Sequence, residues 1–83
     1  MILTCVYGYD EQVEQWWALT REIDVATCAN TLEDARAGLR DAAELYLSYM
    51  RERGENPSRP IPDDVWHDAK GRAKVVETQQ VEA

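Results

Sequence analysis

The sequence contains no phenylalanine, only two cysteines and a single histidine. One histidine and two cysteines fall short of the four ligands that a structural zinc site needs. No stretch approaches the roughly 18 consecutive apolar residues of a membrane-spanning helix, and the first residues lack the basic and then apolar segments of a secretion signal. We therefore expect a cytoplasmic protein with no metal, no cofactor and no membrane segment. In the reducing cytoplasm, Cys5 and Cys28 are expected to be small buried hydrophobic residues.

The sequence patterns of common enzymes are also missing. It has no nucleophile elbow, no glycine-rich phosphate loop and no pair of cysteines two residues apart. His67 lies between Asp64 and Asp68 in a polar segment, where a histidine is usually solvated surface. The many carboxylates are scattered over turns and helix faces, which is typical of solvation and helix capping. We predict no catalytic residue and no enzymatic activity.

What the chain does have is 83 residues, 45% of them hydrophobic, and a net charge of −7. A single domain of this length has a small core, so a partner or a second copy would stabilise it. The acids gather at the front, because residues 1–35 contain seven carboxylates and one arginine. Such a surface repels nucleic-acid phosphates and attracts a basic protein. Direct nucleic-acid binding by this chain alone is therefore not expected.

Three stretches near the start predict strands. Residues 1–9 alternate and are rich in β-forming residues, and residues 13–23 and 25–29 follow after short connections. Connections this short join antiparallel neighbours, so we expect a three-stranded meander. In residues 13–23 the adjacent Trp16 and Trp17 must point to opposite faces of the sheet. Trp17 is assigned to the core; Trp16 either packs against the rest of the chain or anchors a partner.

A long helix follows. Thr31, with Asp34 three residues later, resembles a capping box, and Gly54 after two arginines marks the end of the helix. Apolar residues recur at steps of three and four, which predicts one buried face: Leu32, Ala35, Leu39, Ala42, Tyr46 and Tyr49. We assign Leu39, Ala42 and Tyr46 to the core with Trp17.

The remaining residues 63–83 are treated as an extension of a core formed by residues 1–62. Residues 63–72 predict a single helical turn, capped by aspartate and broken at Gly71. Residues 73–81 predict a fourth strand at an edge of the sheet, with a free tail as the alternative. The predicted fold is thus α+β, in the order β-β-β-α-β.

The segment VATCANTLEDARAGLRDAAELYLSYMRERGENPSRPIP resembles the HicB-like antitoxin family. That family shows a capped leucine and alanine helix after the third strand, followed by a glycine and a proline-rich exit. The matching positions here are Thr31, Leu32, Glu33, Ala35, Ala43, Glu44, Leu45, Tyr46, Leu47 and Gly54. Two positions depart from the pattern: Ala29-Asn30 replaces Gly-Asp before the cap, and Glu22-Ile23-Asp24 replaces a proline-glycine turn.

The resemblance implies a partial ribonuclease-H-like or double-stranded-RNA-binding-like fold. It also implies an antitoxin for a basic HicA-type toxin, a small protein that cleaves mRNA. Many members add a C-terminal DNA-binding domain, and residues 63–83 are too few and too acidic for one. The acidic antitoxin would bind the basic RNA-binding face of the toxin and cover it.

For the partner contact we select Trp16 and three acids near it in sequence, Glu14, Glu22 and Asp24. The alternative function is a stand-alone acidic interaction module that forms homo-oligomers through its open strand edges, without a toxin. A remnant ribonuclease is excluded by the lack of a cluster of acids at suitable strand positions.

Overall fold

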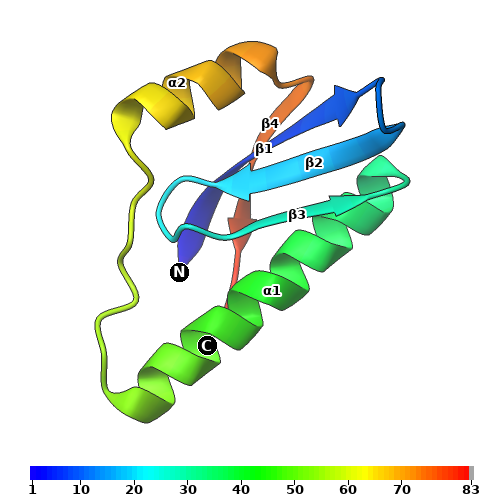
Figure 1. Ribbon diagram of the computed structural model, residues 1–83. Helices are drawn as coiled ribbons and strands as arrows, with labels where there is room; N and C mark the ends of the chain where they lie inside the picture. The colour runs from blue at the N-terminus through cyan, green and yellow to red at the C-terminus, as the bar shows by residue number, and fades with distance from the viewer. Residues whose placement is uncertain (83) are drawn as a thin grey trace.

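The computed structural model describes residues 1–82; Ala83, the last residue of the predicted extension, lies outside them. The fold is α+β, as the sequence predicts (Figure 1). Its elements in chain order are β1 (Ile2–Asp10), β2 (Gln15–Thr20), β3 (Ala26–Ala29), α1 (Leu32–Arg53), α2 (Asp63–Arg72) and β4 (Val75–Gln80).

The four strands form one antiparallel sheet in the order β3-β2-β1-β4. The expected meander of β1, β2 and β3 is confirmed, and the fourth strand pairs with the open side of β1. The extension is therefore part of the sheet, and β3 and β4 are its two edges.

The sheet is covered on both faces, which gives three layers (Figure 1). On one face, Leu3, Cys5 and Tyr7 of β1 pack with the buried stripe of α1. On the other face, Val6 packs with Trp66 and Ala69 of α2. Successive residues of β1 thus enter two different cores, because side chains alternate along a strand.

α1 begins and ends as its sequence predicts. The hydroxyl of Thr31 accepts a hydrogen bond of 3.0 Å from the backbone N–H of Asp34. Gly54 ends the helix with φ of 67°, a left-handed conformation that glycine adopts without steric cost.

The buried stripe of α1 is rotated from the predicted one. Its buried residues are Ala35, Leu39, Ala43, Leu47 and Met50. Leu39 is therefore core, whereas Ala42 and Tyr46 are half-buried. The prediction for Tyr49 was wrong, since 52% of this residue is exposed and Arg53 stacks on its ring. Two adjacent apolar stripes run along the helix, and the sheet covers fully only the one through Leu47.

α2 corrects the prediction of a single turn. It runs for ten residues, and Gly71 lies inside it. Within the described residues no side chain caps its start, where Pro62 occupies the N-cap position. Trp66 is 3% exposed, so tertiary packing stabilises a segment whose own sequence contains few apolar residues.

The connection from α1 to α2 runs beside the β2–β3 connection. Arg59 donates from its backbone N–H to the carbonyl of Glu22, and the N–H of Asp24 donates to the carbonyl of Arg59. Ile61 donates in the same way to Arg21. These bonds hold the proline-rich segment against the sheet.

Candidate functional site

Trp16 and Trp17 lie on the faces opposite to those predicted. Trp16 is half-buried against the α1 side of the sheet, where its ring meets Tyr9 edge-on at 5.6 Å between centroids. Trp17 packs with the Val6 cluster under α2. The alternation itself is as expected, but the prediction assumed one covered face. Since α2 covers the other face, neither indole is fully exposed, and Trp16 is not an outward anchor.

The three predicted acids do not lie together. Glu14 precedes β2, whereas Glu22 and Asp24 follow it. At about 3.3 Å per residue, the eight positions between Glu14 and Glu22 correspond to roughly 25 Å along the strand. These acids therefore belong to opposite ends of the sheet.

Glu22 also stabilises the sheet. Its carboxylate accepts hydrogen bonds of 2.7 Å from the backbone N–H of Thr4 and 2.8 Å from the Thr4 hydroxyl. The carboxylate thereby extends the ladder between β1 and the residues after β2. Asp24 is exposed, and its carboxylate is open to solvent.

Glu14 belongs to a larger group of acids at its own end of the molecule. Tyr9 pairs with Trp16, which pairs in turn with Ala29, so the β1–β2 turn lies beside the end of β3. α1 starts three residues after Ala29, which brings its first turn to the same end (Figure 1). We call the resulting group the acidic end: Asp10, Glu11, Glu14, Glu33 and Asp34, all of them exposed.

The local structure of each segment explains why acids occur here. Asp10 accepts from the N–H of Gln12 at 2.9 Å and so closes the turn. Glu14 has φ of 55°, a left-handed value that completes the turn before β2. Glu33 and Asp34 lie at the positive end of the α1 dipole, which favours carboxylates.

The acidic end keeps a net negative charge after its neighbours are considered. Within residues 1–82 none of its five carboxylates forms an ion pair. Two cations lie beside the turn: Lys74 is over the ring of Tyr9, and Arg72 is over the ring of Trp17. Arg72 also pairs with Asp68 at 3.0 Å. The five carboxylates are thus available to an external basic group.

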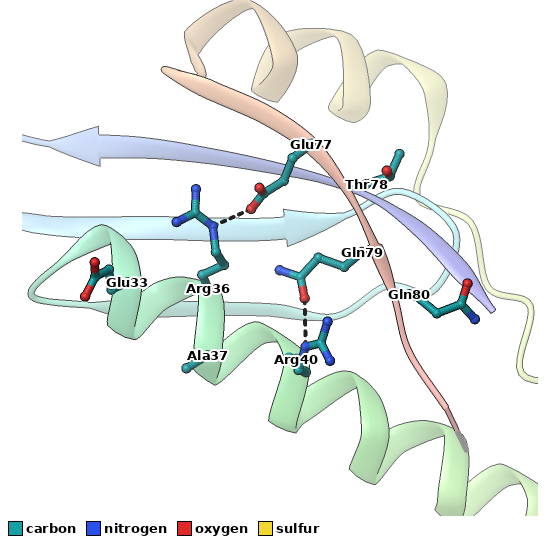
Figure 2. A pocket seen from close by; sticks show the side chains of 8 residues that line it. All are labelled: Glu33, Arg36, Ala37, Arg40, Glu77, Thr78, Gln79 and Gln80. Atoms are coloured by element: carbon teal, nitrogen blue, oxygen red, sulfur yellow. Dashed lines mark hydrogen bonds and ion pairs between the residues drawn. The ribbon is translucent and has the colours of Figure 1, made fainter.

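A polar groove of about 500 Å³ lies between α1 and β4, and Glu33 of the acidic end lines part of it. Figure 2 shows Arg36 and Arg40 reaching from the helix toward Glu77 and Gln79 of the strand. Nε of Arg36 donates to Glu77 at 2.6 Å, which raises the pKa of the guanidinium, and Nε of Arg40 donates to Gln79 at 3.2 Å. These bonds fasten β4 to the helix.

Neither the acidic end nor the groove contains His67 or a cysteine. His67 is exposed, as predicted, and no group of three or more His, Cys, Asp or Glu residues within residues 1–82 is placed to hold a metal ion. Cys5 is buried, which raises the pKa of its thiol to about 11, so it stays protonated at neutral pH. Cys28 is exposed, which corrects the prediction that both cysteines are buried.

Sequence reasoning selected only Glu14 of the acidic end and missed its other four members, Asp10, Glu11, Glu33 and Asp34. Asp34 was recognised only as part of the capping box of the long helix, and the turn at Glu14 was not placed next to it. The signal was present in the predicted meander, because a meander returns the end of its third strand to the first turn. The groove beside β4 gave no comparable signal, since it depends on where the helix crosses the sheet.

Comparison with known protein families, with characterised proteins and with solved structures finds no match to this chain. Neither helix within residues 1–82 combines the length and the apolar character needed to cross a membrane.

Proposed function

We propose that this protein is an antitoxin of the HicB-like type, which binds a small basic RNA-cleaving toxin and covers its RNA-binding surface. The observation that carries the proposal is the acidic end, where five exposed carboxylates from two segments face outward without ion-pair partners in residues 1–82. The resemblance of residues 25–62 to the HicB-like family supports the same role. The protein itself needs no catalytic residue for it, and we place its action in the cytoplasm.

Electrostatics supports occlusion in particular. A toxin that binds RNA presents a basic face, and the acidic end imitates the charge of the RNA phosphates. Opposite potentials raise the association rate, which is what an inhibitor of a lethal enzyme requires.

The test is co-expression with the adjacent small reading frame, if that frame encodes a basic protein that arrests growth when expressed alone. The full chain is expected to restore growth and to co-purify with the toxin. A variant carrying Glu11→Lys and Glu14→Lys is expected to lose at least tenfold in affinity. A matched variant, Asp41→Lys with Glu52→Lys, makes the same charge change on the exposed side of α1 and is expected to bind like the wild type.

The variant Asp24→Lys tests whether the far end of the sheet contributes to toxin binding. A contact surface that spans the whole sheet predicts a loss for this variant as well, whereas a surface limited to the acidic end predicts none. Equal binding by the Glu11/Glu14 variant and its matched control would contradict the proposal. A harmless neighbour that does not co-purify would favour the alternative, a self-associating module without a toxin.

A further inference from the structure

The outer edge of β4 carries unpaired backbone groups that can be identified one by one. Met1 and Val81 exchange two hydrogen bonds, of 2.8 and 2.9 Å. In an antiparallel ladder such pairs alternate, so the odd-numbered residues of β4 bond to β1. The N–H and C=O groups of Val76, Thr78 and Gln80 therefore point away from the sheet. These three residues also have exposed side chains.

β4 lacks the lysine and proline residues that often protect an edge strand. Its sequence, VVETQQ, contains no lysine, proline or glycine. Its one charged residue, Glu77, lies on the α1 side and is paired with Arg36. The opposite edge differs, because β3 has four residues and only Ala26 and Cys28 point their backbone groups outward. The longer and less protected edge is therefore that of β4.

The groove over β4 contains an arginine without a carboxylate partner. Within residues 1–82, Arg40 is bonded through Nε to the side-chain oxygen of Gln79, and no carboxylate pairs with it. Figure 2 shows its terminal nitrogens directed along the groove, beside the strand. A negative side chain placed next to Gln79 by an added strand would complete this site.

We propose that two copies of the chain join through their β4 edges, antiparallel and with Thr78 opposite Thr78 of the second copy, to form one continuous eight-stranded sheet. This register pairs all three outward residues, since Val76 then faces Gln80 of the second copy and Gln80 faces Val76. It also sets Glu77 directly opposite Gln79 of the second copy. The carboxylate of Glu77 thereby lies beside Arg40 of the second copy, which is hydrogen-bonded to that Gln79. The twofold symmetry forms this contact twice.

The second copy fits this edge better than an unrelated strand does. Its own β4 places a second Glu77 next to Arg40 of the first copy. By symmetry, Arg40 of the second copy lies next to Glu77 of the first. On the opposite face, the uncharged Thr78 residues meet without repulsion. A small domain with a limited core also gains stability from such burial. The β4 edge itself contains no member of the acidic end, so the dimer does not depend on the proposed toxin.

The first test is the mass of the full chain in solution by sedimentation equilibrium. We expect a dimer of twice 9.5 kDa at micromolar concentration. Thr78→Lys places two like charges opposite each other and is expected to weaken the dimer at least tenfold while the monomer stays folded by circular dichroism. Cys28→Lys makes a corresponding change at an outward residue of β3 and is expected to leave the dimer intact. A wild-type monomer, or a Thr78→Lys protein that dimerises as well as Cys28→Lys, would overturn the proposal.

The second test reads the register by disulfide formation, in a Cys28→Ser background. Residues opposite each other in a bonded pair lie about 5.5 Å apart between Cα atoms, which a disulfide spans. Thr78→Cys alone is expected to cross-link two copies on mild oxidation. Val76→Cys alone is expected not to, whereas a mixture of Val76→Cys and Gln80→Cys chains is. Efficient cross-linking of Val76→Cys by itself, with none at Thr78→Cys, would show a different register.

Discussion

Residue 8 lies where the indole of Trp17 crosses β1, and only glycine leaves room for it. A Cβ atom built on Gly8 would lie 2.1 to 2.7 Å from three atoms of the ring. The two residues are also directly paired between β1 and β2. The close contact lets Trp17 lie flat on the sheet under α2, where Arg72 stacks on it.

Gly8→Ala is therefore expected to destabilise the protein by about 1–3 kcal/mol, since the indole must move out of the Val6 cluster. The measurement is the free energy of unfolding in urea. Gly71→Ala is the control, because nothing lies within 4 Å of its added Cβ and it stands inside a helix. That substitution is expected to stabilise by about 0.5–1 kcal/mol. Equal effects of the two changes would contradict the packing described here.

The buried thiol of Cys5 is expected to make the protein less stable at alkaline pH. Burial raises the pKa of its thiol from 9.0 to about 11, and burial likewise raises the pKa of Tyr7. In the unfolded chain these groups ionise more readily, so high pH favours unfolding. The contribution of Cys5 is fully present below about pH 9 and is lost as the pH rises to about 11.

The expected loss from Cys5 is on the order of 2 kcal/mol across this interval. It is measured as the free energy of unfolding at a series of pH values. Cys5→Ala removes the thiol, so its curve is expected to be flatter between pH 9 and 11, whatever its stability at neutral pH. Parallel stability curves for the wild type and Cys5→Ala would mean that the thiol has the same pKa in the folded and the unfolded chain.

At the scale of elements, α2 shows most clearly how packing outweighs local sequence. Its apolar side is built mainly from Trp66 and Ala69, which lie three positions apart. Trp66 also has the guanidinium of Arg21 over its ring at 5.5 Å. One aromatic residue thus joins the helix to the sheet and to the segment after β2.

Trp66→Ala is expected to cost about 3–5 kcal/mol, because it empties the centre of the second core. The adjacent His67→Ala, at an exposed position, is expected to stay within about 0.5 kcal/mol of the wild type. Thermal and urea unfolding of the two variants give the comparison. A mild effect of Trp66→Ala would mean that α2 is only loosely docked.

On the scale of the whole molecule, residues 63–82 complete both the sheet and its second cover. β4 pairs with β1 over six positions, and Val81 belongs to the α1-side core. Removal of these residues would leave β1 as an open edge and would expose Val6, which is 0% exposed in the intact chain. We therefore expect the chain to fold as a unit, although its sequence suggests a core ending at residue 62.

A chain truncated after Pro62 is expected to lose cooperative unfolding and near-ultraviolet circular dichroism, because its core is no longer closed. The full-length protein provides the comparison under the same conditions. A sharp unfolding transition of the truncated chain would show instead that residues 1–62 form an independent core.

The elements of the fold were readable from local patterns. Alternation, a capping threonine and a terminal glycine are short-range signals, and they placed three strands, the long helix and the fourth strand. The candidate site was only partly predicted. Glu14 belongs to the acidic end, but Glu22 lies at the far end of β2 and bonds to Thr4. The prediction grouped Glu14 and Glu22 because they are close in sequence. In the structure they flank β2, and the length of the strand separates them.

The sequence by itself determined the class of fold, the ends of α1 and the alternation of Trp16 and Trp17, because each depends on neighbouring residues and on backbone geometry. Only the tertiary structure decided which indole faces α1, that α2 covers the second face, and that Glu33 and Asp34 lie at the same end of the molecule as Glu14. Those features depend on which segments pack together across the sheet. Periodicity fixes that two side chains point in opposite directions, but the side on which a helix docks is set by the packing of the whole chain.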